Sequence, residues 1–478
     1  MSSSNSLQRV IGPGGYFTLA FGSVVGSGWV MVLGEWLTSA GPGGSVLGFA
    51  LGGAVMICVA ACLAELAVRM PRAGGEFNYV LESLGPRAAF AIGWFLSLGL
   101  MAFTAFEGIA LAQLVGALLP QIRGAELYTV FDHAVRVGDV ALGVTGSVLF
   151  AVINYLGTSL AVKLQRIVTF GFIAFIVVLI AAGFVFGDVR NLQPAFASLT
   201  HDSWLTGSLW ILATTAIFLN GFQTALYAIE ERRKDMSARQ VVMPMMGGVL
   251  AAIAFYICIV LAASMIAPWS DITKAPLPAA FAFGKLMDSN LVASAVLIVA
   301  TASLLKSWNA YVLGASRLLL AQAKQGMLPA RLARLHPRFA SPVTAIGLIF
   351  VLNVLGSLLG SGAIVPIVNM CAIVSACSFV VCLSVLLRER RRSSAPAAFT
   401  VPGGTPLIAV TTAAAAIMAA FAFYEPLTRS SGGIPMEWAL MATWAILGAV
   451  FWRTHGRHSG AAQRSTTGNI SRDFSSGV

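Results

Sequence analysis

A long apolar segment near the start of the chain is interrupted at its centre by small residues, and this interruption constrains the fold most. Residues 22–29, GSVVGSGW, place three glycines and two serines within a stretch apolar enough to cross a bilayer. Glycine lets the backbone leave helical geometry without a steric penalty. In hydrocarbon, the freed N–H and C=O groups must line a cavity or bind a ligand. The sequence therefore predicts a binding site at membrane depth, with close helix packing through small residues as the alternative.

The composition assigns the chain to a structural class. Hydrophobic residues make up 58% of the 478 residues, charged residues make up 10%, and the mean hydropathy is +0.84. One soluble core could not bury this much apolar surface, so we expect an all-α polytopic membrane protein. All six cysteines lie in apolar segments, which predicts small core residues and no disulfide framework.

Apolar stretches long enough to span a bilayer recur along the whole chain. The sequence predicts twelve transmembrane helices, at residues 15–39, 45–68, 88–119, 139–161, 166–187, 207–229, 240–267, 291–321, 343–360, 364–387, 405–424 and 434–452. Residues 1–14 precede them, and residues 454–478, rich in Ser, Gly and Thr, are expected to form a disordered tail.

Lysine and arginine are distributed unevenly between the two predicted faces. With both termini in the cytoplasm, the inner segments hold 23 of them and the outer loops hold six. Basic residues near helix ends are retained on the cytoplasmic side, so we expect both termini there, in a multi-pass protein of the cell's inner (plasma) membrane. A basic face beside anionic membrane lipid also accounts for the net charge of +11. Nothing in the sequence indicates a nucleic-acid partner.

A second polar interruption lies at the centre of the predicted sixth helix. Residues 218–224 read FLNGFQT. Helices 1 and 6 are the first members of two consecutive groups of five. A matched pair of broken helices is typical of transporters built from inverted repeats, which bind their substrate at the membrane midplane. The second break therefore favours a binding site over close packing at both positions.

Five motifs carry a family resemblance. They are GSVVGSGW at 22–29, Ala64-Glu65-Leu66 with PRAGGEFNYV at 71–80, Asn154-Tyr155-Leu156-Gly157, FLNGF at 218–222 with the Glu230-Glu231 pair, and SWNAYVLGASRLLLAQAKQGMLP at 307–329. Together they resemble the amino acid/polyamine/organocation (APC) superfamily, and bacterial amino acid permeases in particular. The likeness extends from the first helix to the loop after the eighth, whereas the last four helices are similar only in hydropathy and spacing.

The resemblance implies a five-plus-five inverted-repeat fold that works by alternating access. The first repeat would span residues 15–187 (helices 1–5) and the second residues 207–387 (helices 6–10). Two extra helices, within 405–452, would follow. Helices 1 and 6 of this fold are broken at the midplane.

Within that fold, the resemblance places the substrate between the two breaks. Backbone N–H groups around Ser27 and Gly28 would receive a substrate carboxylate, and carbonyls near Phe218 and Asn220 would accept an ammonium. The expected substrate-binding residues are Val25, Gly26, Ser27, Gly28, Trp29, Phe218, Asn220, Gly221, Phe222 and Gln223. Trp29, Phe218, Phe222 and Gln223 are candidates for sorting the substrate side chain, with contact to lipid or to the core as the alternative for each aromatic.

Two ionisable residues lie deep in other predicted spans, Glu107 in the third and Lys306 in the eighth. A charge at this depth is costly and indicates a function. Sodium-coupled relatives offer hydroxyls from helix 8 to a sodium ion, whereas this chain has Lys306 there, beside Ser307. We therefore expect proton coupling or exchange, with Glu107, Lys306 and Ser307 as coupling residues. A structural ion pair between Glu107 and Lys306 is the alternative.

Acidic residues also lie near the predicted inner ends of helices 2 and 6. Glu65, Glu230 and Glu231 resemble the family's positions for a cytoplasmic gate, and Glu76 lies in the loop between helices 2 and 3. A solvated charged rim is the alternative. Glu35, near the outer end of helix 1, is expected to be interfacial.

We expect a secondary active transporter that moves amino acids. The alternative is a permease for amines or polyamines, which Glu107 favours and Lys306 opposes. A membrane enzyme is a remote alternative, because the five histidines lie in loops or the tail without metal-ligand spacing. A sensor is equally remote, because no large soluble domain is present. No catalytic residue, metal or cofactor is predicted, and the sequence does not indicate an oligomeric state.

Overall fold

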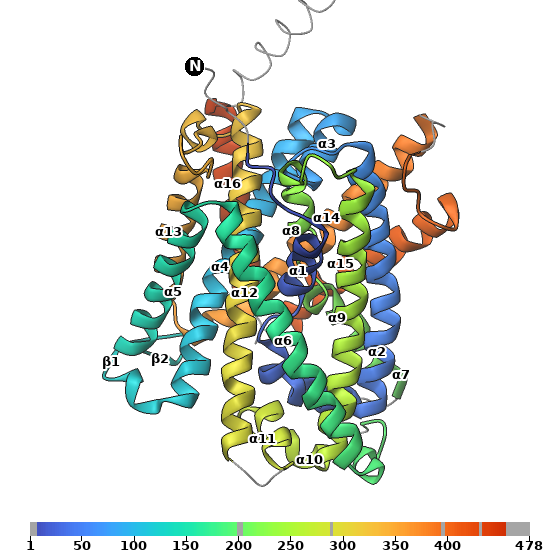
Figure 1. Cartoon of the computed structure of the whole chain (residues 1–478), viewed down its shortest axis with the longest axis vertical. Helices are drawn as coiled ribbons and strands as arrows, with labels where there is room; N and C mark the ends of the chain where they lie inside the picture. The colour runs from blue at the N-terminus through green and yellow to red at the C-terminus, as the bar shows by residue number, and fades with distance from the viewer. Residues whose placement is uncertain (1–6, 198–203, 287–289, 393–396, 430–432, 456–478) are drawn as a thin grey trace, which may run out of the picture.

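The computed structural model describes residues 7–197, 204–286, 290–392, 397–429 and 433–455. Helices dominate these residues, and most of them run along one axis of the molecule (Figure 1). The start of the chain and α3 lie at one end of that axis, and α10, α11 and a β-hairpin lie at the other. The predicted tail lies outside the described residues from residue 456 onward.

The first predicted helix is broken where the glycine-rich stretch predicts. Helix α1 (Pro13–Val24) ends before Val25, and α2 (Gly28–Arg69) begins three residues later. The two predicted spans 15–39 and 45–68 are not separated by a loop, because α2 continues through both and turns at Gly41. Gly41 has φ +71°, and a Cβ atom there would lie 2.7 Å from the Ala197 backbone nitrogen, so the turn requires glycine.

The rest of the first half consists of α3 (Glu76–Leu84), α4 (Pro86–Leu118), β1 (Glu126–Val130), β2 (His133–Arg136), α5 (Val137–Tyr155) and α6 (Thr158–Phe186). The turn between α5 and α6 lies at Leu156-Gly157, earlier than the predicted boundary at 161–166, because Gly157 has φ +111° and ends the helix. The hairpin was not predicted. Its antiparallel strands pair Val130 with His133 across a two-residue turn with positive φ at both positions.

The second half contains α7 (Trp204–Phe218), α8 (Thr224–Tyr227), α9 (Arg239–Ile266), α10 (Trp269–Ile272), α11 (Pro278–Gly284), α12 (Asn290–Lys324), α13 (Val343–Ser357), α14 (Ile364–Arg392), α15 (Gly404–Arg429) and α16 (Met436–His455). Five 3-10 turns connect helices: η1 (Pro120–Arg123), η2 (Val189–Leu192), η3 (Ile229–Glu231), η4 (Ala330–Ala333) and η5 (Ser361–Ala363). The predicted sixth helix is therefore split into α7, α8 and η3, with its break at residues 219–223.

Among the described residues, eight helices are long and apolar enough to cross a membrane: α2, α4, α5, α6, α9, α12, α14 together with η5, and α15. Helices α7 and α13 are apolar but shorter. The chain is thus an all-α polytopic membrane protein.

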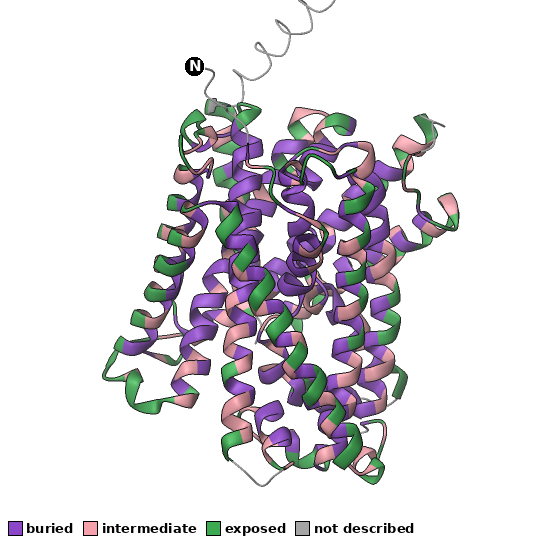
Figure 2. Ribbon diagram, viewed as in Figure 1, coloured by how far each residue is buried: buried purple, intermediate pink, exposed green. Residues whose placement is uncertain are grey.

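Helix α1 is buried at the centre of the bundle, whereas outer helix faces expose apolar side chains. Helix α1 packs against α6, α9 and α12, and its Tyr16 and Leu19 are fully buried. Exposed residues instead follow the outer side of α6 (Figure 2). They include Ile167, Val178 and Phe186, which are more than half exposed. Large apolar side chains on an outer helix face are expected where lipid replaces water.

The start of the chain is joined to the end of the broken sixth helix. The backbone N–H of Ile11 donates to the carbonyl of Glu231 at 2.9 Å, and the N–H of Arg233 donates to the carbonyl of Ile11 at 3.1 Å. This short parallel bridge fixes the segment before α1 beside the segment after η3.

Candidate functional site

The two helix breaks contact each other in the middle of the bundle. The hydroxyl of Ser23, at the end of α1, donates to the carbonyl of Gly221 at 2.8 Å, and Thr224 Oγ1 donates to Ser23 Oγ at 3.2 Å. Gly221 has φ +110°, and a Cβ atom there would lie 2.9 Å from the Ser23 carbonyl oxygen. Only glycine permits this approach. Two segments 198 residues apart in sequence therefore form one unit.

Side chains of the second break satisfy its own backbone. Gln223 Oε1 accepts the Gly221 N–H at 3.1 Å, and Gln223 Nε2 donates to Asn220 Oδ1 at 2.8 Å. Asn220 Nδ2 then donates to Ser375 Oγ on α14, also at 2.8 Å. Gln223 is thus turned toward the break, and Asn220 connects the break to α14.

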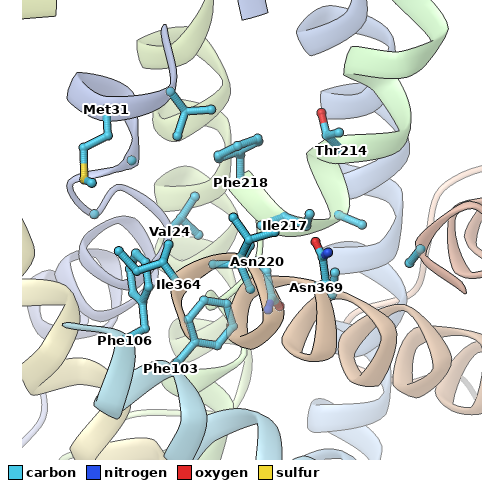
Figure 3. A pocket seen from close by; sticks show the side chains of 18 of the residues that line it. Val24, Met31, Phe103, Phe106, Thr214, Ile217, Phe218, Asn220, Ile364 and Asn369 are labelled. Atoms are coloured by element: carbon cyan, nitrogen blue, oxygen red, sulfur yellow. The ribbon is translucent and has the colours of Figure 1, made fainter. Parts of the chain in front are cut away.

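A cavity of about 200 Å³ lies beside the breaks. Figure 3 shows Phe103 and Phe106 from α4, Ile217, Phe218 and Asn220 from the α7 end, and Ile364 and Asn369 from α14 around it. Val24 and Met31 border it from the first break. The lining is mainly apolar, with a few polar groups. Such lining is typical of a small-molecule site.

Five of the expected substrate-binding residues line this cavity: Gly26, Ser27, Gly28, Phe218 and Asn220. Gly28 is the first residue of α2, so the N-terminus of a long helix faces the cavity. Helix N-termini present unpaired N–H groups and a positive dipole end. The first break can therefore bind an anionic group.

The other five expected residues, Val25, Trp29, Gly221, Phe222 and Gln223, are not among the lining residues. Trp29 is fully buried, with its ring edge-on to Phe255 at 5.8 Å, and Phe222 is stacked with Phe379 at 6.2 Å. Both rings therefore contact other aromatic side chains of the core in this structure. Sequence position alone could not show which way each ring turns.

Buried polar atoms without a hydrogen-bond partner among the described residues lie at the cavity beside the first break. Ser27 Oγ and Glu107 Oε2 are such atoms, on residues 1% and 2% exposed. Buried polar atoms are nearly always hydrogen-bonded in folded proteins. These two atoms therefore mark positions where a ligand or water can supply the missing partner.

Lys306 lies against the first break, on α12. Its Nζ donates to the carbonyl of Gly22 at 3.3 Å and to that of Val25, and lies 4.7 Å from the centre of the Phe172 ring. Ser303 Oγ, one turn away, donates to the carbonyl of Gly26 at 2.8 Å. The ammonium group thus binds carbonyl groups that the break releases from helical pairing.

Glu107 also lies beside the first break, and the described structure has no ion pair between it and Lys306. Its Oε1 accepts a hydrogen bond from Ser307 Oγ, and a Cβ atom on Gly26 would lie 4.0 Å from Oε1. Glu107 lines the cavity, whereas Lys306 does not. Glu107 thus faces the cavity, whereas the Lys306 ammonium contacts backbone carbonyl groups of the break.

Two of the predicted gate residues, Glu231 and Glu65, lie in separate clusters. Glu231 is fully buried and forms a bidentate ion pair with Arg317 of α12, at 2.9 and 3.0 Å, and both also bind the Thr158 hydroxyl. Glu65, also fully buried, is bonded to Arg390. Full burial excludes a solvated rim for these two carboxylates.

Glu65 accepts further hydrogen bonds from Arg69 and from the backbone N–H of Val401, at 2.9 and 2.8 Å. It thereby joins α2 to the end of α14 and to the segment that follows. Glu230 accepts the backbone N–H of Ala73 at 3.1 Å. Sequence reasoning missed Arg317 and Arg390, although a basic residue in an apolar stretch was an available signal for Arg317.

Glu76 differs from these paired carboxylates. It is the first residue of α3, which is not among the membrane-spanning helices, and it is fully buried. The Tyr227 hydroxyl lies near it, but neither carboxylate oxygen makes a hydrogen bond of ordinary geometry within the described structure. Burial raises the pKa of Glu76 from 4.5 to about 7.

Comparison with known proteins supplies the family. The chain matches the amino acid permease family over residues 11–451. It is 29% identical to cationic amino acid transporter 9, chloroplastic, of Arabidopsis thaliana over 70% of this chain, and spans 59% of that relative's length. It is 22% identical to the branched-chain amino acid permease BcaP of Bacillus subtilis, over 84% of this chain and 85% of the relative. A 118-residue segment is 35% identical to the amino-acid permease RocE of Bacillus subtilis, covering 25% of each chain.

The family match covers the breaks, the cavity and both carboxylate clusters. The apolar helices that surround them are those of a multi-pass membrane protein. The chain therefore belongs to the amino acid permease family.

Proposed function

We propose that this protein is a secondary active transporter that carries amino acids across the inner membrane by alternating access. The observation that carries the proposal is the meeting of two broken helices beside a cavity lined by Ser27 and Glu107. Ser27 Oγ and Glu107 Oε2 have no hydrogen-bond partner within the part of the chain that the structure describes. The family match and the transporter names of the relatives support it.

The proposed architecture has twelve spans in a five-plus-five inverted repeat. Helices α1 to α6 form the first repeat, α7 to α14 the second, and α15 and α16 are the extra pair. Each repeat then begins with a broken helix, which supports the division. The excess of Lys and Arg in the inner segments supports cytoplasmic termini.

In the proposed binding mode the two breaks hold the substrate backbone. The α-carboxylate binds the N–H groups at the start of α2, together with Ser27 Oγ. The α-ammonium binds released carbonyl groups at the end of α7, beside Asn220. This arrangement requires both groups of the substrate, so an amine without a carboxylate would use only half of the site.

A binding screen tests this proposal. Ligands that bind only the folded protein raise its thermal-unfolding midpoint, so the purified chain is screened with the common amino acids and their decarboxylated amines. We expect amino acids to shift the midpoint and the matching amines to fail. Shifts by amines alone would establish the amine-permease alternative, and uptake into proteoliposomes then identifies the transported ligand.

A substitution pair tests the carboxylate position. S27A removes a hydroxyl at the cavity, and we expect it to weaken amino acid binding about tenfold, as for a hydrogen bond to a charged group. S378A is the matched control, because Ser378 Oγ is also buried and without a hydrogen-bond partner in the described structure but does not line the cavity. Equal losses in both variants would contradict the proposed binding mode.

We assign proton coupling or exchange to Lys306, with Glu107 and Ser307. The support is the position of the Lys306 ammonium on carbonyl groups of the first break, where a coupling cation would otherwise neutralise them. Uptake into proteoliposomes is measured with a pH gradient and, separately, with a sodium gradient. We expect stimulation by the pH gradient in the wild type and its loss in K306Q, with the exposed K274Q as control. Sodium-dependent uptake that ignores pH would refute the assignment.

A further inference from the structure

The outer face of α6 changes from basic to apolar within its first half. Lys163 and Arg166 are exposed there, and Ile167 and Phe170 follow them on the same face, 62% and 47% exposed. In a membrane protein, large apolar side chains on an outer helix face contact acyl chains rather than water. The order of residues along α6 therefore matches a phospholipid, which has a charged head followed by hydrocarbon.

Helix α9 repeats this order from the same end of the molecule. Arg239, its first residue, is exposed, and Met243 and Leu250 follow on the same face, 42% and 60% exposed. Helices α6 and α9 contact each other, and both begin at the end of the molecule where the chain starts (Figure 1). From Arg239 to Leu250 the helix rises about 16 Å, which is about half the hydrocarbon thickness of a bilayer. The two apolar stripes therefore have the length of one leaflet.

Helix α1 lies between the two stripes and joins them into one surface. The ring of Phe17, on α1, is stacked on that of Phe170 at 6.1 Å, with 8° between the ring planes. A Cβ atom on Gly247 of α9 would lie 3.9 Å from Phe17 Cδ2, so α9 approaches the same ring from its other side with no side chain at that position. Phe17 is half-buried and thus forms an apolar floor between α6 and α9.

Two arginines meet at the basic end of this surface, where the chain enters α1. A Cβ atom on Gly14 would lie 3.8 Å from Arg166 Nε, and one on Gly12 would lie 3.9 Å from Arg233 Cζ. Arg166 makes no ion pair within the part of the chain that the structure describes. Arg233 pairs with Asp235, but this contact is exposed, with 51% and 66% of the two side chains accessible. Water screens such a pair, so the arginine can exchange it for another anion.

The chemistry of this end favours a phosphate group. Two guanidinium groups held beside the same short segment repel each other unless an anion lies between them. The planar guanidinium forms parallel hydrogen bonds to two phosphate oxygens, which makes arginine the preferred partner of phosphate. Because the arginines stand at the head of two apolar stripes, a phosphate that carries acyl chains fits the whole surface, whereas free phosphate fits only one end of it.

We infer that this surface binds one anionic phospholipid, with its phosphate on Arg166 and Arg233 and its acyl chains along α6 and α9 over Phe17. None of these three residues lines the substrate cavity, so the lipid site is separate from it. The inference does not depend on which solute the protein carries. It places a lipid directly on the segment that leads into the first broken helix.

Lipid retention in native mass spectrometry provides the test. The purified full-length chain is titrated in detergent with phosphatidylglycerol and, separately, with phosphatidylcholine of the same acyl chains. We expect the wild type to bind phosphatidylglycerol about thirtyfold more tightly, as for two basic residues beside an anionic lipid, and R166Q/R233Q to lose most of this preference. R331Q/R334Q is the matched control, because Arg331 and Arg334 are also exposed but lie at the 3-10 turn η4, away from the starts of α6 and α9.

The possible outcomes separate a lipid site from a general attraction to charge. Equal binding of the two lipids to the wild type would overturn the inference, even if R166Q/R233Q does not fold. A preference that persists in R166Q/R233Q, or that R331Q/R334Q loses to the same extent, would also overturn it. Inorganic phosphate at the same concentration is expected to leave phosphatidylglycerol bound, and displacement by it would assign the two arginines to a free anion instead.

Discussion

Replacing Glu76 by glutamine is expected to stabilise the protein at neutral and alkaline pH. The carboxyl group of Glu76, at the start of α3, is fully buried. The titratable groups that face it are those of Tyr79, Tyr227 and Cys382. No cation forms an ion pair with it within the described structure. The ionised form therefore lacks the compensation that Arg317 and Arg390 give to the other buried carboxylates.

The magnitude follows from the pKa of Glu76. A rise from 4.5 to about 7 corresponds to a penalty of about 3 kcal/mol for the ionised carboxylate in the folded state. The folded protein binds a proton more tightly than the unfolded chain does. Stability from this group is therefore fully present below pH 4.5, is lost as the pH rises toward 7, and is absent above that.

The assay is the thermal-unfolding midpoint of purified wild type, E76Q and E82Q, measured in one detergent from pH 5 to pH 8.5. We expect the midpoint of the wild type to fall over this range relative to that of E76Q, and the two to converge near pH 5. E82Q is the matched control, because Glu82 lies on the same helix but is exposed and paired with Arg72 at 2.8 Å. Parallel pH profiles for wild type and E76Q would refute the argument.

Three further substitutions test the contacts that hold the breaks and the carboxylate clusters. R317M leaves Glu231 buried without its cation, so we expect a loss of about 3–5 kcal/mol in unfolding free energy, largely restored by adding E231Q. G221A places a Cβ atom against the Ser23 backbone, so we expect it to lower the unfolding free energy by about 1–3 kcal/mol. G171A is the control, because a Cβ atom there lies in open space on α6. Thermal-unfolding midpoints that are unchanged in both variants would contradict this argument. E65Q weakens the bonds of this side chain to Arg390 of α14 and to the backbone N–H of Val401. We therefore expect faster amide hydrogen exchange in the segment after α14, measured by mass spectrometry.

Local composition was enough to predict the positions of both helix breaks. The glycines and serines before Trp29 and the FLNGFQT stretch interrupt the apolar pattern around them. This local contrast can be recognised in the sequence without knowing which helices pack against each other. The long apolar stretches likewise predicted a polytopic helical protein. Their boundaries were less accurate where one glycine decides the turn, as at Gly41, which bends α2 without ending it, and at Gly157.

Tertiary contacts were not predictable in the same way. The pairing of Glu231 with Arg317 joins residues 86 apart, and nothing in the spacing selects that arginine from the other basic residues. The orientation of Trp29 depends on Phe172 and Phe255, which come from other helices.

The bridge between Ile11 and the end of η3 has a practical use in following conformational change. Helix α1 is bonded to α8 at the breaks, through Ser23 and Thr224, and the segment that enters α1 is bonded to the end of η3, through Ile11 and Glu231. Spectroscopic labels at the exposed residues Arg9 and Lys234 would sit on either side of that bridge. We expect the distance between these two labels to stay constant throughout a transport cycle. The pair then provides a reference distance with which the movement of any other labelled helix can be compared.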